Sequence, residues 1–184
     1  LKKTEEFCDS SQILRHLQNS KSQLRQDLFA LGVLEFRKEG FFVEFGATDG
    51  VSLSNTHLLE KEFGWTGIIA EPAKVWHAEL EKNRECAIDK RCVWSKSAEY
   101  LGFLETSVPE LSTVLSSKPE DNHAASRESN SKYNVETVSL SDLLLEHGAP
   151  KEIDYLSVDT EGSEYEILAN FDFGSYDIKV ITVE

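Results

Sequence analysis

The stretch FFVEFGATDG, residues 41–50, decides the fold class of this chain. Four apolar side chains and one acid predict a short buried strand, and Gly46 ends that strand. A second acid and a second glycine follow before a helical pattern begins. In α/β sheets, a glycine turn at the carboxyl end of a strand is a place where ligands bind. The stretch therefore predicts an α/β fold with a ligand site at this turn.

The segments on both sides of this stretch alternate between helices and strands. Residues 11–38 carry apolar positions at helical spacing and predict two short helices. Further helices are predicted at residues 51–63, 74–83, 141–148 (capped by Ser141 and stopped by Gly148) and 162–171. Further strands are predicted at residues 67–72, 91–95, 98–105, 133–140, 153–159 and 178–184. Because several strands are continuously apolar, we predict a Rossmann-like, doubly wound and mainly parallel sheet.

The chain is long enough for one sizeable domain. We expect an N-terminal helical segment at residues 1–38 and the α/β domain at residues 39–184. Residues 106–134 are rich in Ser, Asn, Pro, Glu and Lys, which predicts a mobile insertion or lid. The sequence has no methionine and stops at ITVE, an apolar run ending in an acid. From this we expect a fragment that is truncated after the fifth strand of the sheet.

The composition excludes several classes of partner. There are 33 acids against 19 bases, a formal net charge of -14, so we expect no binding to nucleic acid or to anionic membranes. No apolar run approaches the roughly 20 residues of a membrane span, and the first residues lack the apolar core of a signal peptide. The three cysteines fit no zinc pattern. The sequence therefore predicts a soluble, cytoplasmic protein without a metal site.

The residues at the strand ends indicate which ligand the glycine turn holds. Eight residues fall on this edge of the sheet: Glu44, Gly46, Asp49, Gly50, Glu71, Ser95, Asp159 and Glu184. The turn lacks the G-x-G-x-x-G pattern, and Asp49 would repel a pyrophosphate, which disfavours a dinucleotide. S-adenosylmethionine carries a cationic ammonium and a cationic sulfonium instead, and acids attract both.

Glu71 is the candidate ligand of the cofactor's ribose. It lies 21 residues after Gly50, at the end of the second strand, where a carboxylate accepts hydrogen bonds from both ribose hydroxyls. As an isolated residue it would be read as a solvated strand-end acid followed by a turn proline. Combined with the glycine turn at this spacing, the ribose role is favoured.

Three segments resemble the FkbM family of S-adenosylmethionine-dependent methyltransferases. They are SQLRQDLF (22–29), FFVEFGATDGVSLSNTHLLEKEFGWTGIIAEP (41–72) and IDYLSVDTEGSEYEIL (153–168). The resemblance implies a class I methyltransferase with a seven-stranded sheet, S-adenosylmethionine over the first two strands and the acceptor near the fourth. It implies a first cofactor motif of Glu44, Gly46 and Gly50, the ribose ligand Glu71, and a fourth-strand motif of Asp159, Glu161 and Gly162.

Two departures from the family pattern are visible. Many relatives carry a lysine two positions before the aspartate of the fourth-strand motif, whereas this chain has Ser157 there. A lysine-dependent role therefore does not carry over. The last two strands of the family's sheet, with any acceptor-binding residues on them, are also absent from the chain.

Further cofactor contacts are predicted around the same edge of the sheet. Ala47, Asp49 and Gly50 belong to the glycine turn, and Pro72 and Ser95 follow the second and third predicted strands. The resemblance favours Gln23, Asp27 and Asn55 as residues that close over the methionine end, against the alternative of exposed helix polarity. Of Trp76 and Trp94, we expect only one to stack on adenine.

Asp159 is the candidate catalytic base, and Glu161 of the same motif is a further catalytic candidate. The alternative is that Asp159 caps the helix that begins near Gly162. His123 and Arg127 would share a helical face within the predicted lid, where His123 is a second candidate base and the pair is a candidate ligand of an acceptor carboxylate or phosphate. The alternative there is a solvated loop.

These observations predict methyl transfer from S-adenosylmethionine to a hydroxyl oxygen of a small molecule such as a sugar or another polar metabolite. The rival hypothesis is a catalytically silent module that keeps the fold and recognises a protein or glycan. A third hypothesis, an NAD-dependent oxidoreductase, is weakened by Asp49 and by the missing third glycine.

Overall fold

The computed structural model describes residues 10–106, 113–114 and 129–184. Its larger sheet has five parallel strands in the order β3-β2-β1-β8-β9. Their bounds are β1 Phe41–Phe45, β2 Thr66–Ala70, β3 Ala87–Asp89, β8 Glu152–Val158 and β9 Asp177–Val183. The smaller, mixed sheet has the order β4-β7-β5-β6, with β4 Cys92–Trp94, β5 Tyr100–Thr106, β6 Thr113–Val114 and β7 Ser129–Ser139.

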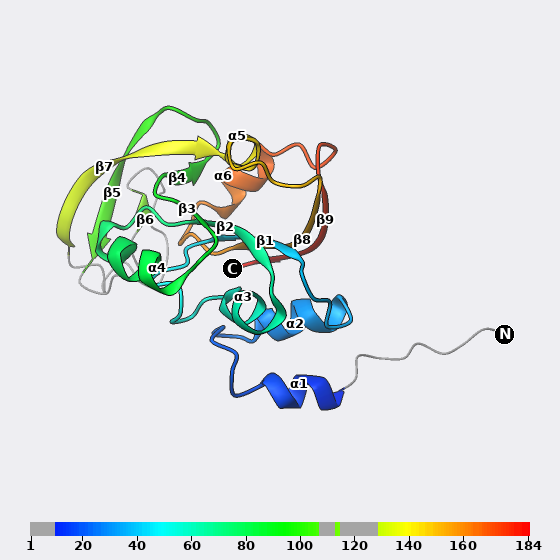
Figure 1. Cartoon of the computed structure of the whole chain (residues 1–184). Coiled ribbons are helices and arrows are strands. Elements are labelled where there is room, and N and C mark those ends of the chain that lie inside the picture. Colours follow the sequence, from blue (N-terminus) through cyan, green and yellow to red (C-terminus); the bar gives the residue numbers. More distant parts are fainter. Residues whose placement is uncertain (1–9, 107–112, 115–128) are drawn as a thin grey trace.

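Helices cover both faces of the parallel sheet (Figure 1). They are α1 Ser10–His16, α2 Gln26–Val33, α3 His57–Phe63, the 3₁₀ turn η1 Lys74–Trp76 with α4 His77–Asn83, α5 Leu140–Glu146 and α6 Glu164–Ala169. Side chains of β1 alternate between the two faces: Phe42 packs with α2 and α3, whereas Val43 and Phe45 pack with α5 and α6. The predicted Rossmann-like, doubly wound and mainly parallel sheet is confirmed.

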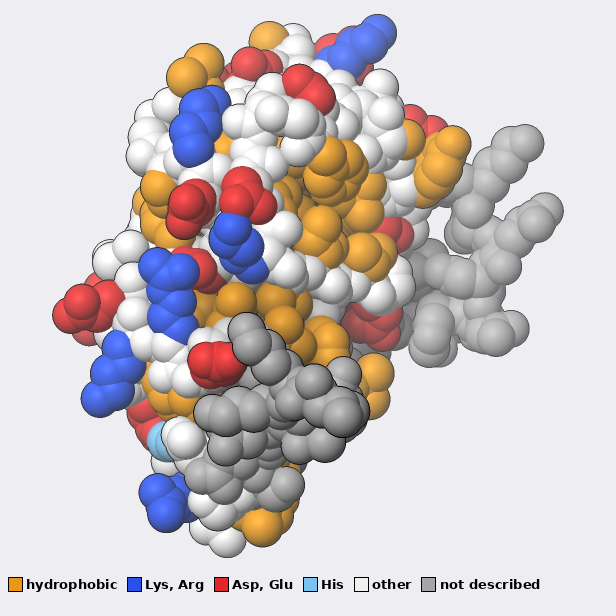
Figure 2. Space-filling model, turned by 90° about the vertical axis from the view of Figure 1, so that its right-hand side faces the viewer, with side chains coloured by type: hydrophobic (Ala, Val, Ile, Leu, Met, Phe, Trp, Pro, Cys, Tyr) orange, Lys and Arg blue, Asp and Glu red, His pale blue; other side chains and the backbone are white. Residues whose placement is uncertain are grey.

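The outer position of β9 explains its weaker burial. β8 lies between β1 and β9, and all its residues except the first are buried. β9 has only β8 as a neighbour among the described strands, and most of its side chains are partly or fully exposed. Figure 2, which turns the right-hand side of Figure 1 toward the viewer, shows apolar side chains among acids and bases on this face. Exposed apolar residues of β9 and α2 are Ile181, Val183, Phe29 and Val33.

The helix predicted at residues 51–63 begins only at His57. The preceding residues are held by the carboxylate of Glu44, which accepts hydrogen bonds from the hydroxyls of Ser54 and Thr56 and from the backbone N–H of Asn55. Because these bonds are made by a loop conformation, they replace the first helical turns that the apolar spacing predicted.

The third strand of the parallel sheet is β3 (Ala87–Asp89), and the prediction of residues 91–95 for this place was wrong. β4, which contains most of the predicted segment, pairs with β7 in the smaller sheet. A three-residue strand is too short to show a hydrophobic period, so only its pairing with β2 reveals it.

The predicted insertion at residues 106–134 is partly wrong, because residues 129–134 belong to β7 and pair with β5. Most of the rest of that range, including His123 and Arg127, lies outside the described residues.

Ends of α5 and α6 also differ from the prediction. Ser139 rather than Ser141 caps α5, since its hydroxyl accepts the backbone N–H of Asp142 at 3.1 Å. The stop at Gly148 is confirmed by its positive φ of 64°. α6 is shorter than the predicted 162–171 at both ends. Within the described ranges, none of the helices combines the length and apolar character needed to cross a bilayer.

Candidate active site

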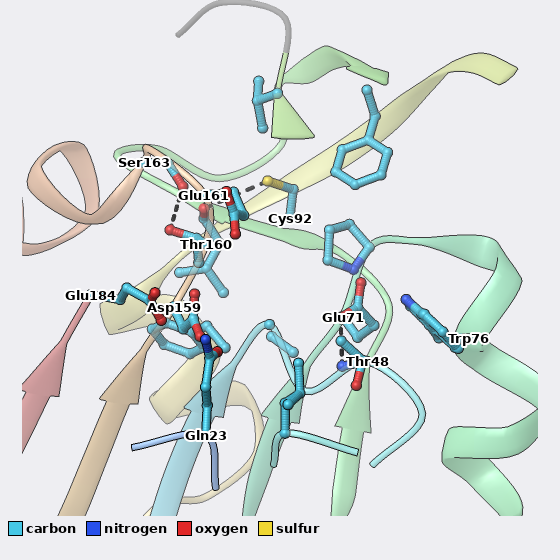
Figure 3. A pocket seen from close by; sticks show the side chains of 18 residues that line it. Gln23, Thr48, Glu71, Trp76, Cys92, Asp159, Thr160, Glu161, Ser163 and Glu184 are labelled. Atoms are coloured by element: carbon cyan, nitrogen blue, oxygen red, sulfur yellow. Dashed lines mark hydrogen bonds between the residues drawn. The ribbon is translucent and has the colours of Figure 1, made fainter. Parts of the chain in front are cut away.

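A pocket lies at the carboxyl ends of β1, β2 and β8, with the smaller sheet as its opposite wall (Figure 3). The ends of the parallel strands contribute Phe45, Gly46, Ala70, Glu71 and Asp159. The smaller sheet contributes Cys92, Val93, Phe103 and Val114, none of which the sequence predicted as site residues. Because those residues reach the pocket through long-range strand pairing, no local motif identifies them.

One part of the pocket is apolar. Its lining includes Trp76, Cys92, Phe103 and Val114, which belong to one apolar cluster. Trp76 lines this pocket and Trp94 does not. An apolar wall with aromatic side chains suits a flat ring system such as a purine.

Glu71 lies beside this apolar part, directly after β2. Its side chain accepts hydrogen bonds from the backbone N–H of Thr48 at 3.0 Å and of Ala73 at 2.8 Å. Burial, followed by the charges of Glu44 and Glu105, raises the pKa of Glu71 to about 7 despite these two bonds. The carboxylate thus joins the loop after β1 to the loop after β2 and presents acceptor oxygens to the pocket.

The raised pKa of Glu71 gives stability a specific pH dependence. The folded protein binds this proton more tightly than the unfolded chain does, whose carboxyl has the ordinary value of 4.5. The contribution to stability is therefore full below that value and is lost as pH rises through about 7. We expect the midpoint of thermal unfolding to fall less between about pH 5 and about pH 8 in Glu71→Gln than in the wild type. Parallel declines in the two proteins would contradict this.

Asp159 and Glu184 lie side by side at another end of the pocket, next to Gln23 (Figure 3). Asp159 follows β8, and Glu184 follows β9, where its backbone N–H donates to the carbonyl of Val158 at 3.2 Å. Burial, then the hydrogen bond and charge of Glu184, then the charges of Glu161 and Glu164, raise the pKa of Asp159 to about 8. Glu184 is a site residue that the catalytic prediction did not include, although its strand-end position placed it on this edge.

Gly46 allows the loop after β1 to contact the loop after β8. Its φ is +77°, and a Cβ atom added to it would lie 1.8 Å from the carbonyl oxygen of Asp159. The glycine is therefore required for a close approach between two protein backbones, beside the pocket that it lines.

Glu44 lies under the glycine turn, and the structure places its carboxylate in a buried network outside the pocket lining. Arg84 is the cation of this network, with a fully buried side chain. It lies 3.6 Å from the Glu44 carboxylate, and it donates to Glu60 at 2.6 Å and to the carbonyl of Gly50 at 3.2 Å. Arg84 and Glu44 together fix the loop that follows β1. The sequence pattern did not predict this role of Arg84.

The other residues predicted for the turn also serve the protein itself. Asp49 accepts from the backbone N–H groups of Val51 and Ser52, and Ala47 is buried in the core. Gly50 faces the side chains of Leu80 and Arg84. None of Ala47, Asp49 and Gly50 is among the residues that line the pocket.

Asp27, Asn55 and Ser95 also lie outside the main pocket. Asp27 is fully buried, and burial raises its pKa; it accepts from the hydroxyl of Ser20 at 2.7 Å. Asn55 donates to Ser157, the residue in place of the family's lysine, and lines a neighbouring pocket that shares Asp159 and Glu184. Ser95 follows β4, which pairs with β7 in the smaller sheet. It therefore does not lie at the end of a strand of the larger, parallel sheet, as the prediction assumed.

Of the predicted cofactor and catalytic residues, six line the main pocket: Gln23, Gly46, Glu71, Pro72, Asp159 and Glu161. The alternative reading of Asp159 as a helix cap is wrong, because α6 begins after Ser163. Glu164 instead accepts the backbone N–H groups of Thr160 and Gly162. Among the residues that the structure describes, no cluster of three or more His, Cys, Asp or Glu side chains is arranged to hold a metal ion.

Residues 44–184 match the family model of the methyltransferase FkbM domain, which covers most of the chain. The chain belongs to the FkbM methyltransferase family. The FkbM match begins in β1 and contains both the glycine turn and the VDTEGSE block on which the resemblance was based. A search among curated proteins gave no match. The pocket described above therefore lies within a methyltransferase domain.

Proposed function

We propose that the FkbM domain transfers a methyl group from S-adenosylmethionine to a hydroxyl oxygen of a small, polar acceptor. The observation that supports this proposal is the order in which apolar and acidic side chains follow one another along one pocket. Trp76 lies next to the carboxyl group of Glu71, and the acids Asp159 and Glu184 lie farther along (Figure 3). This order corresponds to an adenine, a ribose and a cationic methionine end.

The lining residues have the donor and acceptor types that this cofactor requires. Glu71 accepts hydrogen bonds from the ribose hydroxyls. The acids at the far end stabilise positive charge, and Gln23 offers both an amide donor and an amide acceptor there. No lysine, arginine or histidine occurs among the described residues that line the pocket. That charge pattern favours a cationic ligand over a pyrophosphate.

When bound, the cofactor supplies a methyl group on a positively charged sulfur, already activated for transfer. The protein's own contribution is to align an acceptor hydroxyl and to receive its proton. Asp159 is placed for the second task at the end of β8. Its pKa is raised to about 8 in the protein without ligand, and in its ionised form it can accept the proton of the acceptor hydroxyl. Because a hydroxyl group must lose a proton when it is methylated, a base at this position supports a hydroxylated acceptor.

Glu71 provides the test of the cofactor assignment. In Glu71→Gln a neutral amide replaces the charged acceptor, so we expect S-adenosylhomocysteine to bind about tenfold more weakly, the difference between charged and neutral hydrogen bonds. Titration calorimetry on both proteins measures this.

The matched control is Glu79→Gln, which neutralises an exposed acid on α4 and should leave binding unchanged. Wild-type affinity in a correctly folded Glu71→Gln variant would refute the ribose assignment. If the wild type binds no S-adenosylhomocysteine at all, the catalytically silent module becomes the better hypothesis.

A further inference from the structure

Asp159 and Glu184 come from adjacent strands and separate two pockets. β8 and β9 pair up to Val158 and Val183, and the bond from the Glu184 N–H to the Val158 carbonyl extends the ladder by one residue. This holds the two acids side by side (Figure 3), where Glu184 raises the pKa of Asp159. Both residues line the main pocket and its smaller neighbour. Because two adjacent ionised carboxylates repel each other, one shared proton stabilises the pair.

Among the described residues that line the two pockets, none brings a positive charge to this pair. Glu161 and Glu164 add negative charge from the loop after β8 and from α6. The N-terminal segment contributes the neutral Gln23, the loop after β1 contributes the uncharged Gly46, and Glu71 lies across the pocket. Neither pocket has a lysine, arginine or histidine among its described lining residues. A proton or a bound cation would therefore stabilise the two adjacent carboxylates.

We propose that Asp159 and Glu184 form a proton-sharing pair that responds to the charge of the cofactor. The pair releases its proton to solvent when S-adenosylmethionine, with its positive sulfur, is bound. It keeps the proton when S-adenosylhomocysteine, with its neutral sulfur, is bound. Glu184 is thus a positioning residue that sets the charge of Asp159. This inference rests on the proposed function.

The pair gives the site a means to distinguish the methylated cofactor from its demethylated product. With the proton gone, two carboxylates attract the positive sulfur and Asp159 is ionised for the acceptor proton. S-adenosylhomocysteine has no positive sulfur and gains nothing from this attraction. At a pH at which the pair loses its proton to the bound cofactor's charge, the product is therefore held less tightly than the cofactor. Any proton exchange at Glu71 is common to both ligands, because their ribose groups are identical.

Titration calorimetry with S-adenosylmethionine and S-adenosylhomocysteine on the full chain tests the inference. We expect the ratio of the two affinities to shift toward S-adenosylmethionine by about tenfold per pH unit from about pH 6 to about pH 8, and to level off above. Near pH 7, buffers of different ionisation enthalpy should report about one more proton released with S-adenosylmethionine.

Glu184→Gln separates this role from a structural one. The amide donates to Asp159 without a shared proton, so we expect the affinity ratio to become independent of pH. Glu152→Gln, the same change at the opposite end of β8, should keep the wild-type profile.

Three outcomes would overturn the inference, and they can be told apart. Identical pH profiles for the two ligands in the wild type remove it while leaving the proposed function intact. A pH-dependent ratio that persists in Glu184→Gln removes the role of Glu184. Failure of both ligands to bind the wild type removes the proposed function, and the inference with it.

Discussion

Replacing Arg84 by alanine is expected to lower the free energy of unfolding by about 3–5 kcal/mol, the cost of removing one partner from a buried ion pair. The guanidinium donates to Glu60, to the hydroxyl of Thr56 and to the carbonyl of Gly50, and it lies against Glu44. Without it, Glu44 and Glu60 keep their negative charges in a region with little water. Chemical denaturation followed by circular dichroism measures the loss.

A second ion pair at the end of the same helix gives the control. Lys82 and Glu79 form a pair at 3.3 Å in which both side chains are largely exposed. Lys82→Ala should change stability by less than about 0.5 kcal/mol, because solvent screens such pairs. A loss below about 1 kcal/mol in Arg84→Ala would show that the network does not hold the loop after β1.

Gly46→Ala is expected to destabilise the fold by about 3–5 kcal/mol, combining the strain of a positive φ with overpacking. The new methyl group would lie 1.8 Å from the carbonyl oxygen of Asp159, so the loops after β1 and β8 would have to separate. Asp159 would move with its loop, and we also expect the variant to lose S-adenosylhomocysteine binding in calorimetry.

Gly64→Ala isolates the contribution of the backbone angle. Gly64 has a similar φ of +68° at the end of α3, with nothing within 4 Å of an added Cβ. We expect a loss of about 1–2 kcal/mol there and no effect on ligand binding. Equal losses in the two variants would mean that the contact with Asp159 has no energetic importance.

The strands at the centre of the fold could be predicted from the sequence because their burial is continuous. β1, β2 and β8 are buried over nearly their whole length, and most of their buried residues are apolar. β3 could not be predicted, since its first two residues are only half-buried and Asp89 at its end is polar. β4 had the pattern of a strand, but its partner β7 lies more than 30 residues later in the chain.

The site was predictable where a residue directly follows a parallel strand. Glu71 and Asp159 occupy such positions, and both line the pocket. Glu44 lies within β1, where side chains alternate, so its carboxylate faces the same side as Phe42 and lies beneath the loop. Arg84 and Phe103 reach their places through α4 and through strand pairing, which depend on the whole fold.

The smaller sheet affects ligand affinity because its strands are hydrogen-bonded separately from those of the parallel sheet. β4, β5, β6 and β7 pair with each other and not with the parallel sheet, yet Cys92, Phe103 and Val114 form a wall of the pocket. Only molecules in which the smaller sheet is formed and packed against the parallel sheet have a complete pocket. The apparent affinity is then the intrinsic affinity multiplied by the fraction of such molecules. Substitutions in β5 or β7 that loosen the sheet will therefore weaken binding without contacting the ligand, and a bound ligand will in turn hold the two sheets together.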